Sequence, residues 1–303
     1  MAARWSAIAL GCQLLLGAGL AAALATGSRL SALAVAALVI GELCCVAFLL
    51  AAAPLALGQA MAAPGCTPRG RGTRMLEALW RDAWALDLAL GRMALEPCRA
   101  PVKSPQATAR SPAHPVMLVH GFACSRAVWR PLLARLGAAD VGPVRAVSLE
   151  PLFAGIDAYA AQLLTELEGL GARSGGGAVT IVAHSMGGLV ARAALRSARP
   201  GLVGRIITIG APHHGTTLAC CFRWPSAREM CPGSSWLAEL NACQEGRLDI
   251  PMTTLYSLDD NYVVPAGSAR FHGARAIELR GIGHLGLLDS KAVLGQVVSE
   301  LAE

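Results

Sequence analysis

The sequence is poor in aromatic and charged residues, which make up 5% and 15% of its 303 positions. Proteins that bind nucleic acids usually carry clustered basic side chains interleaved with aromatic ones. No such pattern recurs in the globular part of this chain, although its formal net charge is +6. We therefore expect no nucleic-acid partner.

The sequence also lacks a metal-binding motif. The ten cysteines do not have the spacing of a zinc site. His213 and His214 are adjacent, so their side chains point in different directions, and no third ligand stands out. We expect neither a metal nor another cofactor. Four cysteines cluster in one segment and would form bridges only in an oxidising compartment, with Cys220 or Cys221 joined to Cys231 or Cys243.

Charge is almost absent from two long apolar segments near the N-terminus. Residues 5–26 carry no charged side chain, and residues 30–57 carry only Glu42. Each segment is long enough to span a hydrocarbon core of about 30 Å at about 1.5 Å per residue. With a short joint at residues 27–29, the pattern predicts a transmembrane helical hairpin over residues 1–60.

The first apolar segment has an alternative interpretation as a cleaved signal peptide. Arg4 supplies a basic start, and Ala23-Leu24-Ala25 resembles a cleavage site. If the hairpin forms, the arginines that follow it place the rest of the chain on the cytoplasmic face by the positive-inside rule. We expect that topology in an inner membrane, with a periplasmic domain as the alternative if only one segment spans.

Residues 61–114 hold most of the excess positive charge, with eight basic and four acidic side chains. Such an excess beside a membrane span favours contact with anionic lipid head groups, and an ordinary solvated surface is the alternative. Within this region, residues 75–95 place Trp80, Trp84 and Leu88 at helical spacing. This spacing predicts an amphipathic helix on the bilayer or on the following domain. A proline-rich linker follows at residues 97–115.

Residues 115–303 alternate between strand and helix patterns. Apolar, β-branched runs predict strands, and amphipathic stretches between or after them predict helices. The alternation indicates an α/β domain with a mainly parallel sheet covered by helices on both faces. The expected strands are residues 115–119, 144–149, 178–183, 205–210, 252–257 and 276–280, and the expected helices are residues 127–136, 157–171, 188–199 and 291–301.

The sequence Ala183-His184-Ser185-Met186-Gly187 stands between a predicted strand and a predicted helix. This is the context of a nucleophile elbow, in which small neighbours let the backbone pass closely and the serine hydroxyl points away from the sheet edge. The helix N-terminus also favours negative charge there. Ser185 is therefore the candidate nucleophile, and we expect His184 to pack beside it rather than act as a second base.

A serine nucleophile needs a base and an acid that orients the base, and both types of residue follow Ser185. His284 lies in a glycine-flanked loop after a predicted strand, and Asp260 lies in a loop after another. We expect His284 to accept the serine proton and Asp260 to hold the imidazole in the required tautomer. Asp259 is the alternative acid.

Together these motifs resemble the small bacterial lipases of the α/β-hydrolase superfamily. The resemblance covers residues 115–303 and implies a minimal α/β-hydrolase fold with about six strands. It implies that the backbone N–H groups of Phe122 and Met186 form the oxyanion hole. We interpret His120, which precedes this loop, as a structural residue that fixes it, with a direct catalytic role as the alternative. Two residues separate the acid from a following valine in that family, which favours Asp260. The matching segments are residues 119–122, 183–188, 210–215 and 281–288.

Residues 216–250 lie between the fourth and fifth predicted strands and are too many for a plain connection. We interpret them as a cap over the site. Trp224, Trp236 and Leu237 are expected to contact the acyl chain of a substrate. A rigid buttress that does not touch the substrate is the alternative.

The sequence thus predicts a membrane-anchored serine hydrolase of the bacterial inner membrane, acting on lipid-like acyl esters through an acyl-enzyme. Its expected partners are the ester substrate and the bilayer, and the sequence gives no oligomeric state. An acyltransferase or thioesterase would use the same residues. A membrane scaffold or chaperone with a hydrolase-like domain is the non-enzymatic alternative.

Overall fold

A computed structural model describes residues 68–94, 115–246 and 248–303 of the chain. The described residues belong to one compact unit that extends from Ala51 to Glu303. The predicted hairpin over residues 1–60 and nearly all of the proline-rich linker lie outside the described residues. Within those described ranges, no helix combines the length and the apolar character needed to cross a bilayer.

The fold is built on a six-stranded sheet in the order β2-β1-β3-β4-β5-β6, with every neighbouring pair parallel. This confirms the predicted parallel sheet. All six residues of β3 are buried, because helices cover both faces of a parallel sheet and its inner strands must be apolar throughout. The strands are β1 (Val116–Val119), β2 (Val144–Val147), β3 (Val179–His184), β4 (Val203–Ile209), β5 (Met252–Ser257) and β6 (Arg275–Leu279).

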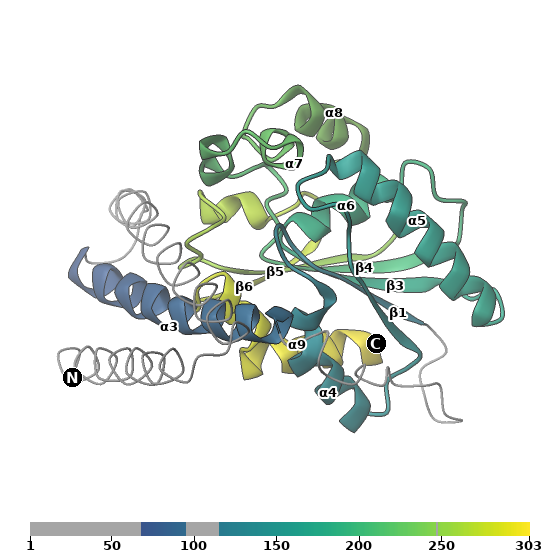
Figure 1. The fold of residues 1–303 in the computed structure, drawn as a ribbon, viewed down its shortest axis with the longest axis horizontal. Coiled ribbons are helices and arrows are strands. Elements are labelled where there is room, and N and C mark those ends of the chain that lie inside the picture. Colours follow the sequence, from purple (N-terminus) through teal and green to yellow (C-terminus); the bar gives the residue numbers. More distant parts are fainter. Residues whose placement is uncertain (1–67, 95–114, 247) are drawn as a thin grey trace, which may run out of the picture. The chain divides into compact units, whose positions relative to one another are not determined.

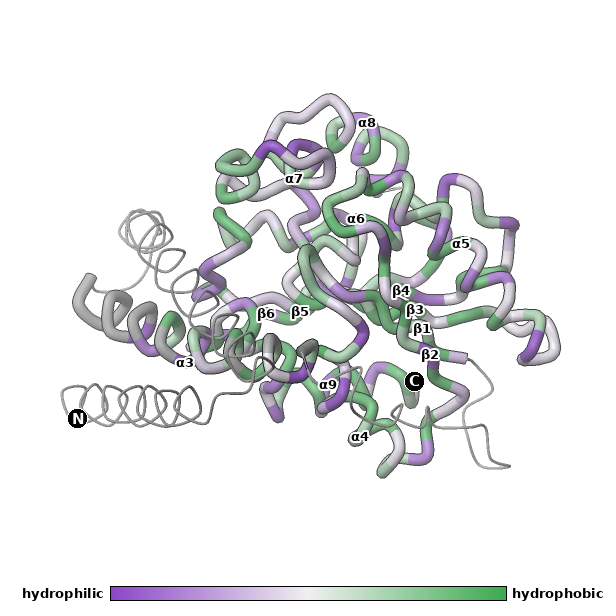
Figure 2. Tube along the Cα trace, viewed as in Figure 1, coloured by the Kyte–Doolittle hydropathy of each residue, from purple (hydrophilic) through white to green (hydrophobic). Residues whose placement is uncertain are grey.

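Two hydrophobic cores lie on opposite faces of the sheet (Figures 1 and 2). One core packs α5 (Ile156–Arg173) and α6 (Met186–Ala194) against the sheet. The other packs α4 (Arg130–Ala138) and α9 (Lys291–Ala302) against the opposite face. The predicted helices are therefore present, and the two layers hold the carboxyl ends of the strands in fixed positions.

Helix α3 (Pro68–Ala94) joins the second core. It contacts the 3-10 helices η1 (Arg126–Trp129) and η4 (Leu285–Leu288). Its buried stripe consists mainly of small residues, whereas Trp84 and Leu88 are 39% and 52% exposed. Trp84 and Leu88 thus lie outside the packed stripe, whose small side chains let the helix approach the domain closely, while Leu86 and Met93 pack partly buried against the same core. The buried stripe contains Ala78, Leu79, Asp82, Ala85 and Ala89.

The segment predicted as a cap contains three short elements: η2 (Thr217–Cys221), α7 (Pro225–Glu229) and α8 (Ser235–Gln244). A disulfide joins Cys220 to Cys231, one of the pairings left open by the sequence. Helix α8 is tied to α6 by the fully buried Arg192, whose guanidinium donates to the side chains of Gln244 (3.1 Å) and Asn241 (2.8 Å). This end of the cap is therefore a rigid support.

Candidate active site

The candidate site lies at the carboxyl ends of the strands, which all point to one edge because the sheet is parallel. Ser185 follows β3, and the loop with Phe122 follows the adjacent strand β1. Asp260 follows β5, and His284 follows β6. The sheet order therefore brings four segments that are distant in sequence to one edge, as is usual for ligand sites in α/β folds.

The backbone of Ser185 is strained. Its φ is 55° and its ψ is −130°, a conformation that residues with a side chain rarely adopt. A Cβ on Gly187 would lie 2.6 Å from the carbonyl oxygens of both Val119 and His120, so no larger residue fits there. This geometry is that of the elbow predicted from the small residues around the serine.

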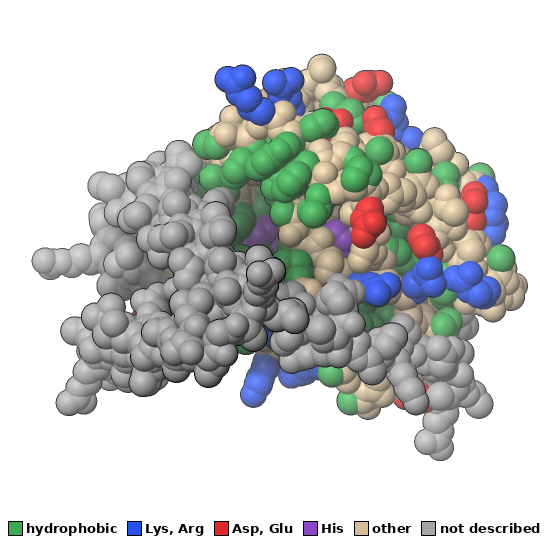
Figure 3. Space-filling view, viewed as in Figure 1, with side chains coloured by type: hydrophobic (Ala, Val, Ile, Leu, Met, Phe, Trp, Pro, Cys, Tyr) green, Lys and Arg blue, Asp and Glu red, His purple; other side chains and the backbone are tan. Residues whose placement is uncertain are grey.

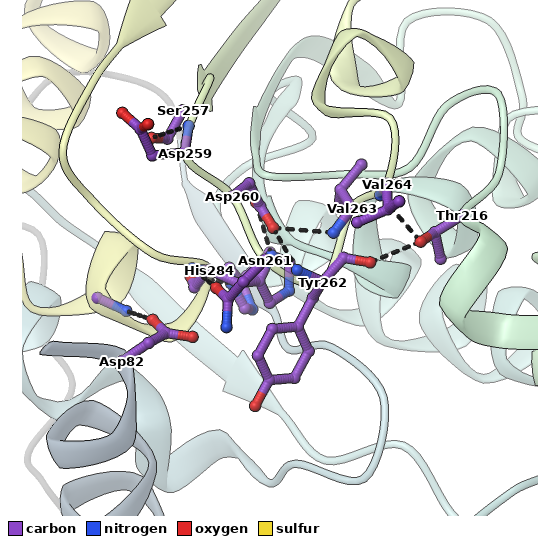
Figure 4. Close-up of polar contacts among 12 residues, drawn as sticks. Asp82, Thr216, Ser257, Asp259, Asp260, Asn261, Tyr262, Val263, Val264 and His284 are labelled. Atoms are coloured by element: carbon purple, nitrogen blue, oxygen red, sulfur yellow. Dashed lines mark hydrogen bonds and ion pairs between the residues drawn. The ribbon is translucent and has the colours of Figure 1, made fainter. Parts of the chain in front are cut away.

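Asp260 and His284 form a buried pair, drawn in Figure 4. Asp260 Oδ2 lies 2.8 Å from His284 Nδ1, and both residues are at most 4% exposed. Asp260 Oδ1 accepts the backbone N–H groups of Tyr262 and Val263, both at 2.8 Å. The acid is thus fixed by its own loop and oriented towards the imidazole.

Asp259, the alternative acid, is occupied elsewhere. Its Oδ2 accepts the backbone N–H of Gly281 at 2.6 Å, and its own N–H donates to the hydroxyl of Ser257 at 3.2 Å. Successive residues in this turn point in different directions, so only one of the two carboxylates reaches the histidine.

Gly210 brings the elbow and the Asp260–His284 pair together. The Ser185 N–H donates to the carbonyl of Ile209 at 2.9 Å. A Cβ on Gly210, whose φ is 56°, would lie 3.2 Å from both Asp260 Oδ2 and His284 Nδ1. Among the described residues no hydrogen bond joins the hydroxyl of Ser185 to His284. Catalytic hydrogen bonds often tighten only when substrate binds.

The electrostatics of the site shift the pKa values of His284 and His184 in opposite directions. Burial opposes protonation of His284, but the charge of Asp260 and its hydrogen bond outweigh burial and raise the pKa of His284 above its ordinary value. Burial, and secondarily the charge of His284, lower the pKa of His184 well below its ordinary value. His184 therefore remains neutral, as expected for a packing residue.

A general base must be neutral to accept a proton, so the raised pKa of His284 shifts the onset of activity to higher pH. We expect kcat/KM for a soluble ester to rise with pH, with a midpoint above the ordinary histidine value of 6.5. In Asp260→Asn protein the midpoint of the residual activity should move down, because the charge that stabilises the imidazolium is gone. A rate that does not vary between about pH 5 and 8 would contradict His284 as the base.

The loop expected to supply one oxyanion-hole donor lies against the elbow. A Cβ on Gly121 would lie 2.8 Å from Ser185 Cβ, so the loop before Phe122 touches the elbow. His120 fixes this loop, because its Nε2 accepts the Leu149 N–H at 3.0 Å. The Phe122 N–H has no acceptor among the described residues, and Met186 opens α6, where N–H groups have no intrahelical acceptor.

Beside this loop, four aromatic side chains from three segments form an aromatic cluster, defined as Phe122, Phe153, Phe222 and Trp224. Phe153 and Trp224 stack with ring centroids 4.2 Å apart, and Trp224 is 40% exposed. Figure 3 shows hydrophobic side chains gathered on this face of the domain, with histidine visible beside them. The cluster offers an apolar surface next to the elbow.

The other two residues expected to contact substrate lie elsewhere. Leu237 is 2% exposed and belongs to the core on the α5 side of the sheet. Trp236 packs against the same core and donates its indole N–H to Asp157 of α5 at 3.0 Å. Both serve the packing of α8, because the helix turns these side chains towards α5 and the core.

A further acidic residue, Asp82 of α3, reaches the site and was not anticipated. It is 1% exposed, and burial raises its pKa to about 6. Figure 4 places it beside the loop that carries His284. The sequence signal for such a residue is a carboxylate at helical spacing among small apolar residues, which marks a charged group on a packed face. Among the described residues, no cluster of potential ligands is arranged to hold a metal.

Comparisons with known proteins agree with this architecture. The PGAP1-like alpha/beta domain family matches residues 160–221, which include Ser185 but neither Asp260 nor His284. No curated protein matches the sequence. The mature form of the lipase BlEst2 from Bacillus licheniformis superposes with a TM-score of 0.55 at 18% identity, covering 67% of this chain and 96% of that one. Lipase B from Aspergillus fumigatus superposes with a TM-score of 0.56 at 20% identity, covering 65% of this chain and 56% of that one. The chain therefore has an α/β-hydrolase-like fold, shared with lipases.

Proposed function

We propose that this protein is a serine hydrolase that cleaves carboxylic esters. The observation that carries the proposal is the buried Asp260–His284 pair, 2.8 Å apart, at the same sheet edge as the strained Ser185. The strained backbone of the serine and the burial of the Asp–His pair both cost free energy of folding, and a purely structural domain would gain nothing from either. The site thus supports acyl transfer over a purely structural role.

In the proposed reaction, the Ser185 hydroxyl attacks the ester carbonyl carbon while His284 Nε2 takes its proton. The N–H groups of Phe122 and Met186 donate to the resulting oxyanion. The bond from the carbonyl carbon to the alkoxy oxygen then breaks, and His284 returns the proton to the leaving alcohol. Water then attacks the acyl carbon while His284 takes its proton, and the bond to the Ser185 oxygen breaks as His284 returns that proton to the serine, which releases the acid.

We further propose that the substrate has a lipid-like acyl chain. The aromatic cluster lies directly beside the expected oxyanion hole and keeps Trp224 partly exposed. The likeness in fold to two proteins named as lipases points the same way. An apolar surface of this kind binds methylene groups, each contributing about 0.8 kcal/mol when fully buried.

Membrane anchoring is part of this proposal. It is supported by the two apolar segments within residues 5–57 and by the basic residues that follow them. Tethering would hold the site next to its lipid substrate, with the domain in the cytoplasm and a periplasmic domain as the alternative. Release of the full chain from membranes by alkaline carbonate would contradict the anchor.

The direct test is hydrolysis of p-nitrophenyl esters of graded chain length by the detergent-solubilised full chain, together with labelling by a fluorophosphonate probe. Labelling with hydrolysis would support the proposal. Labelling with transfer of the acyl group to an added alcohol in preference to water would indicate an acyltransferase. Absence of both signals would contradict a serine hydrolase.

Trp224→Ala should change the chain-length preference. We expect kcat/KM for a laurate ester to fall about 10-fold, while that for acetate changes by less than about twofold, because only the long chain reaches the aromatic cluster. Trp236→Ala is the matched control, since Trp236 packs towards α5. Equal losses for both esters in Trp224→Ala would argue against an acyl-binding role.

A further inference from the structure

Helix α3 contacts the loop that carries His284 at several points, although more than 180 residues separate them in sequence. The loop is residues 281–289, between β6 and α9. Arg81 Nη1 donates to the carbonyl of Gly281 at 3.5 Å. Asp82 Oδ1 accepts the N–H of Gly286 at 2.7 Å. The guanidinium of Arg92 donates to both carboxylate oxygens of Asp289, at 2.7 and 3.1 Å. The helix therefore holds both ends and the middle of the loop.

Asp82 makes the buried contact of this set. The backbone of Gly283 approaches it so closely that a Cβ there would lie 2.6 Å from both Cγ and Oδ1 of Asp82. Asp82 Oδ1 accepts the N–H of Gly286. The carboxylate is thus in contact with the backbone on both sides of His284.

The second oxygen of Asp82 lies near Asn261. Asp82 Oδ2 and Asn261 Nδ2 are both buried without a hydrogen-bond partner among the described residues, and Figure 4 shows the Asn261 amide pointing towards the Asp82 carboxylate. The other end of the Asn261 side chain is committed, because its Oδ1 accepts the backbone N–H of His284 at 3.0 Å. Asn261 therefore turns its donor towards Asp82.

This arrangement requires two acceptors at position 82. Oδ1 accepts the N–H of Gly286, and Oδ2, which has no partner of its own in the described part of the chain, lies on the side of the Asn261 amide (Figure 4). A carboxylate supplies both, whereas an asparagine would turn its own NH₂ towards one of the two donors. A buried donor left without an acceptor is costly, so the loop would shift to relieve it.

We propose that Asp82 is a positioning residue for the proposed hydrolysis, whose carboxylate holds His284 against Asp260 in two ways. It accepts the N–H of Gly286 in the same loop, and it orients Asn261, which accepts the N–H of His284. The inference rests on the proposed function of the site. It makes α3, which precedes the hydrolase-like domain in sequence, a part of the catalytic apparatus.

The test exchanges the two side chains. Asp82→Asn and Asn261→Asp are made singly and together in the full chain. Each single variant creates a mismatch. Asp82→Asn turns two NH₂ donors towards each other, and Asn261→Asp places two carboxylates side by side. In the double variant, the amide introduced at position 82 accepts from Gly286 through its oxygen and donates to the carboxylate introduced at position 261. That carboxylate still accepts the N–H of His284, so every hydrogen bond and the net charge are restored.

We expect each single variant to lose about 10- to 100-fold in kcat with KM changed less than about threefold, since misplacement of a catalytic group affects turnover rather than binding. The double variant should recover to within about fivefold of wild type. Glu77→Gln, at an exposed acid on the same helix, is the matched control and should leave kcat unchanged. A double variant no better than the product of the two single losses would overturn the proposal, as would losses confined to KM.

A second measurement does not depend on turnover. The proton between His284 Nδ1 and Asp260 should give a low-field NMR signal that is absent from His284→Ala protein. We expect this signal to be lost or shifted in both single variants and restored in the double variant. Wild-type protein that cleaves no ester would refute the proposed function, and the NMR pattern would still decide whether Asp82 positions His284.

If the variants at position 82 do not fold, Arg92→Gln gives an independent test. Arg92 and Asp289 are partly exposed, so their separation leaves no fully buried charge. We expect a smaller loss of kcat, about two- to fivefold, with the same shift of the low-field signal. An unchanged signal and unchanged kcat in this variant would count against control of the loop by α3.

Discussion

Replacement of Ser185 by alanine is expected to abolish both fluorophosphonate labelling and ester hydrolysis. The hydroxyl is the atom that forms the covalent bond in both reactions, so no other residue can substitute for it at the elbow. We expect kcat to fall by about 10⁴-fold or more, to the level supplied by substrate binding and the oxyanion hole alone. The comparison uses the detergent-solubilised full chain of each protein at matched total protein concentration.

Alanine is small enough for this position, but, like serine, it rarely adopts a positive φ such as the 55° of Ser185. The strain is already present with serine, so the variant should fold with little change in its unfolding midpoint. Equal labelling of wild-type and Ser185→Ala protein would place the reactive group elsewhere. Loss of hydrolysis with retained labelling would likewise contradict Ser185 as the nucleophile.

The second large effect is expected for Asp260→Asn. Asp260 Oδ1 accepts two backbone N–H groups, so an asparagine would keep its oxygen there and turn its NH₂ towards His284 Nδ1, where the carboxylate oxygen lies at 2.8 Å. We expect kcat to fall about 10³- to 10⁴-fold, because the imidazole then favours the wrong tautomer for accepting the serine proton. Initial rates at saturating ester measure this directly.

Asp259→Asn is the matched control, one residue away and equally buried. Its carboxylate accepts the N–H of Gly281 at 2.6 Å, and an asparagine oxygen can still accept that bond. We expect a change in kcat of less than about fivefold. A larger loss in Asp259→Asn than in Asp260→Asn would reverse the assignment of the acid.

The parallel sheet was predictable because strand and helix patterns are local. Apolar β-branched runs alternate with amphipathic stretches, and each expected strand agrees with an observed one to within two residues. The position of the elbow was equally predictable from the sequence, since small residues must surround a strained serine between a strand and a helix. These periodicities predicted the fold class, whereas the order of the strands within the sheet came only from the structure.

Contacts between distant segments were less predictable. The resemblance favoured Asp260 over Asp259, and the turn after β5 directs the Asp260 carboxylate to His284 while that of Asp259 accepts the N–H of Gly281. Likewise, Trp224, Trp236 and Leu237 are close in sequence, yet the geometry of α7 and α8 sends Trp224 to the aromatic cluster and the other two towards the core.

The sequence by itself determined the order of strands and helices, the position of the elbow and the types of residue available for catalysis. These depend on the periodicity and size of neighbouring side chains. Tertiary structure alone decided that Asp82, 202 positions before His284, would be buried beside its loop. A carboxylate on a helix has no preferred partner until packing excludes water and limits its choice, which is why that contact follows from the folded chain and not from any local pattern.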